Sequence, residues 1–179
     1  MRRLRYGVAM SLDGYIAGPN GEFDWIPHDP DIDFAEIFSQ FDTVVMGRQT
    51  FALSLKQNAQ GTFHGMRTVV VSRTVRPGDY PAVTVIGDNV ADAIAALKAA
   101  PGKDIWLFGG GVLFKSLLDM RLVDGIDVAI VPVLVGGGIP FLPSAERRWS
   151  LTLKKQRVYG TSGIIGLEYS IHADPEHHS

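Results

Sequence analysis

Short runs of apolar residues alternate with amphipathic segments along most of the chain. An apolar run of roughly four to eight residues bounded by turn residues is typical of a buried strand, whereas apolar residues three and four positions apart indicate a helix. We therefore predict strands and helices in alternation over the first two thirds of the chain. The predicted strands span residues 4–12, 43–46, 67–72, 83–86, 105–108 and 125–135. The predicted helices span residues 30–41, a short segment after residue 50, 90–100 and 112–120.

The last part of the chain has a different pattern. Residues 151–159 and 164–171 alternate apolar and polar positions around Gly160-Thr161-Ser162-Gly163, which predicts an antiparallel hairpin. Together the patterns predict an α/β fold of three layers, with a mostly parallel central sheet, helices on both faces and the hairpin at one edge. A chain of 179 residues with 46% apolar content can bury one core, so we expect one domain over residues 1–172 and a disordered tail over 173–179.

Composition excludes several classes of function. The formal charge is −2 and the basic residues are dispersed, which disfavours nucleic acid and membrane surfaces as partners. The chain has no cysteine, no apolar run near the roughly 20 residues of a spanning helix, and no signal-peptide pattern, so we expect a cytoplasmic protein. The histidines lack metal-ligand spacing, and the nucleophile-elbow and P-loop motifs are absent, so we predict no metal site, hydrolase or nucleoside triphosphatase.

Three turns carry the clearest candidate chemistry. They are residues 46–50 (MGRQT), 71–74 (VSRT) and 108–112 (FGGGV), and each follows a predicted strand. A strand that ends in such a turn before a helix directs free backbone N–H groups at one point, which suits a phosphate. Arg48 and Arg73 add guanidinium groups that bind phosphate oxygens in pairs. The three turns predict an NADPH-type cofactor, although each alone also fits an ordinary turn or a solvated arginine.

The dinucleotide fingerprint G-x-G-x-x-G is absent, which disfavours a standard Rossmann NAD site. Acidic residues crowd the segment between the first two strands, and a partly buried carboxyl there could supply the proton that accompanies a hydride. We take Asp31 and Asp13 as the catalytic candidates. The alternatives are that Asp13 closes the turn after the first strand and that Asp31 stabilises a helix N-terminus. Trp25 could cover a planar ring or belong to a small apolar cluster.

Six segments, taken in order, resemble a known family. They are Ser11–Ala17, Asp24-Trp25, Met46–Phe51, Val70–Arg73, Leu107–Gly111 and Asp127–Gly136. The chain resembles the dihydrofolate reductase superfamily and is most similar to the reductase domain of the bifunctional riboflavin-biosynthesis deaminase/reductase and its stand-alone relatives. This resemblance implies an NADPH-dependent reductase with an eight-stranded, mostly parallel sheet, a C-terminal antiparallel strand and a homodimeric assembly.

The resemblance also implies roles for particular residues. It implies that Ala9, Ile16 and Ala17 flank the nicotinamide and that residues 18–25 form a mobile loop over it. The remaining cofactor contacts would come from Gly47, Arg48, Gln49, Thr50, Ser72, Arg73, Thr74, Gly109, Gly110, Gly111 and Val112, with a cis peptide between two of the glycines. The substrate contacts would come from Trp25, Asp24 and Pro132.

The activity implied is hydride transfer to a carbonyl or imine carbon of a small heterocyclic or ribosyl substrate. The closest family activity is the reduction of 5-amino-6-(5-phosphoribosylamino)uracil. One alternative is dihydrofolate reduction, and another is a nucleotide-binding protein that has lost turnover, because a fold alone does not settle function. The sequence shows no added basic cluster for a ribose phosphate on the substrate side.

Overall fold

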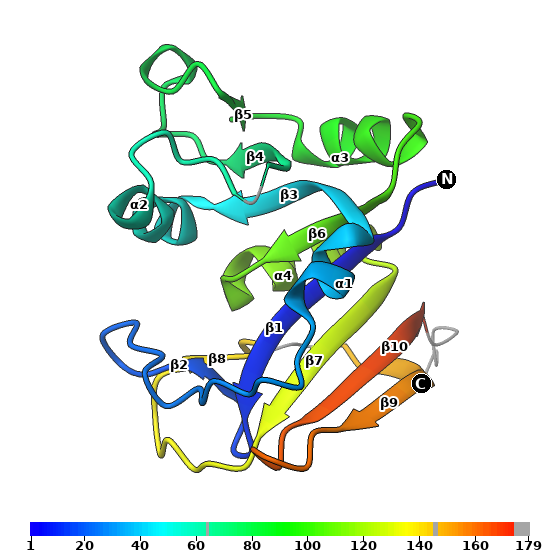
Figure 1. Cartoon of the computed structure of the whole chain (residues 1–179). Helices are drawn as coiled ribbons and strands as arrows, with labels where there is room; N and C mark the ends of the chain where they lie inside the picture. The colour runs from blue at the N-terminus through cyan, green and yellow to red at the C-terminus, as the bar shows by residue number, and fades with distance from the viewer. Residues whose placement is uncertain (64, 145–146, 174–179) are drawn as a thin grey trace.

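The computed structural model describes residues 1–63, 65–144 and 147–173. The strands of its main sheet are β1 (Leu4–Ser11), β3 (Phe41–Gly47), β4 (Arg67–Val71), β5 (Val83–Ile86), β6 (Asp104–Phe108), β7 (Gly125–Val131), β9 (Trp149–Val158) and β10 (Ile165–Ala173). These eight strands lie in the order β5-β4-β3-β6-β1-β7-β10-β9 (Figure 1). Within the sheet β10 is antiparallel to both of its neighbours, and the pairs from β5 to β7 are parallel. The predicted mostly parallel sheet with a C-terminal hairpin is confirmed.

Helices cover both faces of this sheet. They are α1 (Phe34–Ser39), α2 (Arg48–Gln57), α3 (Val90–Ala99) and α4 (Gly111–Asp119), with a short 3₁₀ helix, η1 (Pro77–Asp79). Side chains of α3 and α4 pack into the core on one face, and side chains of α1 and α2 pack into a second core on the other face. The three predicted layers are therefore present. None of the described helices is long and apolar enough to cross a membrane.

The alternation of side chains along β1 shows how one strand serves both faces. Leu4 and Tyr6 are fully buried in the α3 and α4 layer, where the Tyr6 ring stacks on Phe114 with centroids 3.9 Å apart. Burial of each such side chain contributes about 1.5–3 kcal/mol to stability. The intervening residues, Arg5 and Gly7, face the opposite layer, because successive side chains of a strand point to opposite faces.

Two predicted elements are shorter in the structure. The predicted helix over 30–41 is confined to α1, because Asp33 is its N-cap and accepts a hydrogen bond from the Glu36 N–H at 2.9 Å. The buried Asp29 carboxylate holds the preceding turn by accepting from the Asp31 N–H at 2.8 Å. The strand predicted over 125–135 ends at Val131, since the next residue is proline and cannot donate to a ladder.

A small second sheet was not predicted. It pairs β2 (Tyr15–Ala17) with β8 (Ile139–Pro140) in antiparallel fashion. Strands this short carry little periodic signal in a sequence, and their pairing joins segments more than one hundred residues apart. Of the tail expected at 173–179, Ala173 is the last residue of β10, and residues 174–179 lie outside the described residues.

Candidate active site

The three predicted phosphate turns lie side by side at one edge of the sheet. They follow β3, β4 and β6, and β3 hydrogen-bonds to both of the other strands. Parallel strands end at the same edge, so the turns after them meet there. In Figure 1 this is the edge at which α2 and α4 begin. The structure thus brings together residues 47–50, 72–74 and 109–112, which the sequence places far apart.

The helices at this edge begin without side-chain caps. The N-cap positions of α2, α3 and α4 are Gly47, Asn89 and Gly110, and none of them makes a side-chain capping hydrogen bond. In contrast, α1 is capped by the Asp33 carboxylate. Uncapped first-turn N–H groups together with the helix dipole favour an anion. This edge therefore has the backbone chemistry that a dinucleotide phosphate requires.

Backbone angles and close packing explain in part why glycines follow β6. Gly109 and Gly110 have φ of 72° and 55°, which residues other than glycine rarely adopt. A Cβ on Gly109 would lie 2.5 Å from Thr50 Oγ1, so the turn packs directly on the first turn of α2. The expected cis peptide between two glycines is wrong, because all peptide bonds between described residues are trans. The positive φ values supply the sharp turn instead.

The turn after β4 holds Ser72 inward and Arg73 outward. Ser72 is buried, and its Oγ accepts from the N–H groups of Thr74 and Val75, both at 3.1 Å. Arg73 is exposed and lines a hollow of about 430 Å³ together with Asp88 and the start of α3. Neither Arg73 nor Arg48 forms an ion pair with a described residue. Both guanidinium groups are thus available to a ligand at this edge.

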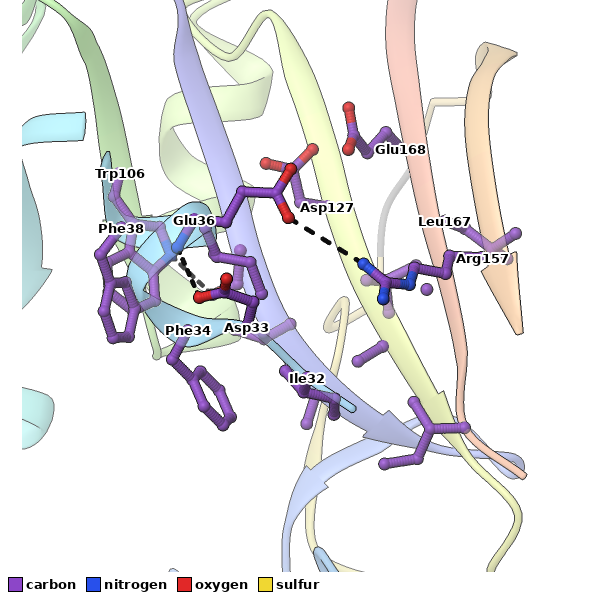
Figure 2. Close-up of a pocket in the computed structure, with 18 of the residues that line it drawn as sticks. Ile32, Asp33, Phe34, Glu36, Phe38, Trp106, Asp127, Arg157, Leu167 and Glu168 are labelled. Carbon is purple, nitrogen blue, oxygen red and sulfur yellow. Dashed lines mark hydrogen bonds and ion pairs between the residues drawn. The ribbon is translucent and has the colours of Figure 1, made fainter. Parts of the chain in front are cut away.

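A second, more sheltered pocket of about 450 Å³ lies on the sheet face that α1 covers (Figure 2). Its floor is formed by residues without large side chains on three adjacent strands, namely Gly7, Ala9, Ala129 and Gly166. Small residues at these positions leave a space that larger side chains would fill.

Apolar and aromatic side chains form most of this pocket. Ile26, Val131 and Ile164 line it near Ala9, towards the carboxyl ends of β1 and β7. On the α1 side, aromatic rings pack edge and face against one another; they are Phe34, Phe38, Phe63, Trp106 and Phe108. Such walls suit a planar ring.

The opposite end of the pocket is charged. Arg5, whose side chain is 6% exposed, forms an ion pair with Asp127 at 2.7 Å and approaches Glu168 at 3.6 Å. Arg157 approaches Glu36 at 4.0 Å across the pocket, as Figure 2 shows. Burial raises the pKa of the Asp127 carboxyl above its usual value, although the neighbouring Arg5 acts in the opposite direction. Asp127 is thus a pocket carboxyl that holds a proton more readily than an ordinary aspartate.

Residues 2–165 match the family model described as the RibD C-terminal domain. The chain belongs to the RibD C-terminal domain family. Two Bacillus subtilis (strain 168) proteins are similar over most of their length, and both are uncharacterised. YyaP is 34% identical over 179 residues and covers 94% of each chain, and YwjB is 26% identical over 156 residues, 86% of this chain and 90% of its own.

Solved structures support the same fold. A proposed riboflavin biosynthesis protein from Shewanella sp. PV-4 is 28% identical, with a TM-score of 0.80 over 95% of this chain and 99% of its own. The Thermotoga maritima diaminohydroxyphosphoribosylaminopyrimidine deaminase/5-amino-6-(5-phosphoribosylamino)uracil reductase has a TM-score of 0.68 at 18% identity over 94% of this chain and 56% of its own. Enterococcus faecalis dihydrofolate reductase, complexed with NADP(H) and RAB-propyl, has a TM-score of 0.66 at 20% identity over 97% of both chains.

The two predicted catalytic aspartates, Asp13 and Asp31, do not line the 450 Å³ pocket. The Asp13 carboxylate accepts hydrogen bonds from the Ser11 hydroxyl at 2.6 Å and from the N–H groups of Val135 and Gly136, which lowers its pKa to about 2. It ties the turn after β1 to the loop after β7. Asp31 is exposed and accepts from the Thr161 hydroxyl at 3.3 Å. Their catalytic roles stay predictions without support from the pocket geometry.

The predicted nicotinamide neighbours occupy the ends of β1 and the small sheet. Ala9 lines the pocket, while Ile16 and Ala17 belong to β2, close to β1. Trp25 packs beside Ala9 in an apolar cluster, and its indole N–H is buried with no partner among the described atoms. Asp24 is exposed.

The other predicted contacts are more exposed. Pro132 is exposed directly after β7, and the side chains of Gln49 and Val112 are exposed in the first turns of α2 and α4.

Sequence reasoning missed the charged wall of the pocket. Arg5, Asp127 and Glu168 are single charged residues inside strands that otherwise bury apolar side chains. A charged residue inside a strand of apolar residues indicates a charged partner nearby, because burying an unpaired charge is energetically unfavourable. Asp88, in the hollow beside Arg73, was also missed.

Proposed function

We propose that this protein is an NADPH-dependent reductase that transfers hydride to a carbonyl or imine carbon of a small heterocyclic or ribosyl substrate. Membership of the RibD C-terminal domain family supports this proposal. Two proteins that share its fold are a 5-amino-6-(5-phosphoribosylamino)uracil reductase and a dihydrofolate reductase complexed with NADP(H). Reduction of 5-amino-6-(5-phosphoribosylamino)uracil is the family activity that we take as the starting point.

The observation that carries the proposal is the position of Ala9. This residue is the predicted neighbour of the nicotinamide, and it also lines the sheltered pocket on the sheet face. The strand that bears it, β1, lies beside β6, whose glycine turn is the predicted pyrophosphate site. A dinucleotide along the carboxyl edge would reach the apolar end of the pocket with its reactive ring. A reductase needs such a junction between a phosphate-binding edge and an enclosed substrate site.

The residues at the edge fit an NADPH-type cofactor. The uncapped starts of α2 and α4 would bind the pyrophosphate through backbone N–H groups. Arg73, exposed beside the 430 Å³ hollow, would bind the adenosine 2′-phosphate, with Ser72 holding the turn that presents it. The bound nicotinamide would supply the hydride. The chain's own part is to hold the two reactants in place and to exclude water.

The pocket also offers a source for the proton that completes the reduction. Asp127 lines the pocket, and burial raises its pKa. A carboxyl that stays protonated nearer to neutral pH is a better proton donor than a solvated one. We therefore propose Asp127, in preference to Asp31 and Asp13, as the group that holds the proton at its carboxyl oxygen while Arg5 fixes its orientation at 2.7 Å.

Dihydrofolate reduction and nucleotide binding without turnover are the competing proposals. Both proposals include a cofactor bound at the edge, and they differ from ours only in the compound that the pocket binds or converts. Steady oxidation of NADPH with a substrate panel that contains 5-amino-6-(5-phosphoribosylamino)uracil and dihydrofolate separates the three. Turnover of either compound excludes the binding-protein proposal, and tight cofactor binding with no turnover of any compound supports it.

The first experiment is a titration of the purified protein with NADPH and with NADH, followed by nicotinamide fluorescence. We expect clear preference for NADPH, because NADH lacks the phosphate that Arg73 would bind. Equal affinity for NADPH and NADH contradicts the assignment of the 2′-phosphate to Arg73. It would indicate that Asp88 has the larger effect on cofactor binding in the hollow. Absence of binding by both contradicts the whole reductase proposal.

A further inference from the structure

The charged wall of the 450 Å³ pocket decides which polar group a substrate can present there. The wall is formed by sheet-face positions of β1, β7, β10 and β9 and by the N-cap and first turn of α1, which face them across the pocket (Figure 2). Its cations are Arg5, Lys155 and Arg157, and its carboxylates are Asp33, Glu36, Asp127 and Glu168. Within the described lining, every cation therefore has carboxyl groups close to it.

Each of these cations already has a carboxylate partner. Arg5 contacts Asp127 at 2.7 Å, Asp104 at 3.5 Å and Glu168 at 3.6 Å. Lys155 lies 3.7 Å from Glu168. Arg157 lies 4.0 Å from Glu36, and its guanidinium also packs on the Tyr159 ring at 4.9 Å from the centroid.

A phosphate group needs unpaired cations or backbone N–H groups that converge on it. At this wall a phosphate dianion would meet a carboxylate beside each cation, and their repulsion would oppose the attraction. The one helix that begins here, α1, has its N-terminus occupied by the Asp33 carboxylate at 2.9 Å from the Glu36 N. The cofactor edge, with its free guanidinium groups and uncapped helices, has the opposite chemistry.

We infer that the substrate of this pocket carries no phosphate group and is an uncharged or cationic ring compound whose polar edge donates hydrogen bonds to the carboxylates of the wall. The inference rests on the proposed function, because it names the substrate class of the same site. Glu36 and Glu168 are the specificity-determining residues, since they neutralise Arg157 and Lys155. The ring itself would lie against the apolar end of the pocket, next to Ala9.

The test compares two ligands that differ only in the phosphate: 5-amino-6-(5-phosphoribosylamino)uracil and its dephosphorylated riboside. Binding to the purified protein is measured by isothermal titration calorimetry, and turnover is measured as NADPH oxidation. We expect the riboside to bind at least tenfold more tightly. Tighter binding of the phosphorylated compound, equal binding of the two, or no binding of the riboside overturns the inference.

The double variant Glu36→Gln/Glu168→Gln sharpens this test. Removing both carboxylate charges frees Arg157 and Lys155, so affinity for the phosphorylated compound should rise at least fivefold while affinity for the riboside does not rise. The matched control is Asp119→Asn, which frees Lys115 from an exposed pair on α4 outside the pocket and should change neither affinity. An unchanged affinity of the double variant for the phosphorylated compound, with a cooperative thermal transition preserved, overturns the role of the two glutamates.

Failure of the inference and failure of the proposed function give different results. Loss of the proposed function would appear as no binding of NADPH in the separate titration, because the cofactor edge is built from other residues than the charged wall. Failure of the inference alone would leave NADPH binding intact and reverse the preference between the two ligands.

Discussion

The cofactor edge and the substrate pocket differ in how the chain builds them. The edge consists of short consecutive segments, each at the end of one strand, and its binding groups are largely backbone N–H groups and exposed guanidinium groups. The pocket consists of side chains taken from six strands, together with α1 and neighbouring loops. The edge offers guanidinium groups without an ion-pair partner among the described residues, whereas each cation of the pocket wall lies beside a carboxyl group.

This difference separates the two parts of a reductase by charge. A dinucleotide brings several phosphates, and the edge is suited to them. In our proposal, the wall of paired charges disfavours phosphates in the pocket, so that they bind at the edge. The comparison predicts that substitutions in one region leave ligand binding in the other region nearly unchanged.

The largest effect is expected from filling the pocket without touching the edge. Gly166→Leu adds a side chain to the pocket floor, where the first added carbon would lie 3.5 Å from the Tyr159 ring and 3.8 Å from the Arg157 carbonyl oxygen, both ordinary contacts. We expect kcat/KM for any substrate to fall at least on the order of a hundredfold, because the ring can no longer approach the hydride donor. NADPH affinity should stay within about twofold of the original protein in the fluorescence titration, because the cofactor edge is unchanged.

Gly160→Leu, on an exposed turn with open space, is the matched control and should change neither quantity. A parallel loss of NADPH binding by Gly166→Leu would mean that the two regions are not independent.

Replacing the proposed proton donor should have the next largest effect. Asp127→Asn keeps the shape of the side chain and removes its acidity, so kcat should fall on the order of a hundredfold. Asp31→Asn should have little effect, because that carboxylate is exposed and does not line the pocket. Steady-state kinetics of the two variants across pH 5–9 checks this. If Asp31→Asn is the more damaging change, the sequence-based assignment of Asp31 is correct and the pocket argument is wrong.

At the cofactor edge, Arg73→Ala should weaken NADPH about tenfold and leave NADH nearly unchanged, because only NADPH carries the phosphate. Arg76→Ala is the matched control, as this neighbouring arginine is exposed and does not line the hollow. Fluorescence titrations of both variants with both cofactors give the four affinities. A loss of the same size for NADH would place Arg73 on another part of the dinucleotide.

The smallest effect concerns stability at low pH. Hydrogen bonds from the Ser11 hydroxyl and from the Gly136 and Val135 N–H groups lower the pKa of Asp13 from 3.8 to about 2. A carboxyl with a lowered folded-state pKa contributes stability above its unfolded pKa and loses it as the pH falls through the folded value. The melting temperature should therefore decline from about pH 4 towards pH 2.

Asp13→Asn should flatten this decline, whereas Asp24→Asn, an exposed aspartate of the next loop, should not. Thermal unfolding followed by circular dichroism between pH 2 and pH 6 checks both variants. Equal slopes for the original protein and Asp13→Asn would mean that other carboxylates control acid stability.

The sequence predicted the framework well where one pattern acts locally. Apolar runs predicted β1 and β3 to β7, alternation predicted β9 and β10, and the turns predicted to bind the cofactor lie at one edge of the sheet. The prediction was wrong where a side chain overrode periodicity, as when the Asp33 cap confined the helix expected over 30–41 to α1. It was also wrong about the cis peptide, since positive φ at Gly109 and Gly110 forms the same turn with trans bonds.

Most residues of the pocket could not be predicted from the sequence, because they come from segments that are far apart along the chain. Arg5, Asp127 and Glu168 meet only because β1 lies beside β7, which lies beside β10. Each could have been marked as a charge inside a buried strand, but its partner depends on strand order and register. The catalytic assignment of Asp31 rested on the crowding of acidic residues between the first two strands, and the pocket geometry does not support it.

The amino-acid sequence by itself determined the alternation of strands and helices and the glycine-rich and basic turns between them, because both arise from interactions within a few residues. The tertiary structure alone decided which turns share an edge, where the sheet leaves a hollow, and which charges neutralise one another inside it. Those properties depend on pairing between distant segments, and a shift of a strand by one residue would turn every pocket side chain to the opposite face.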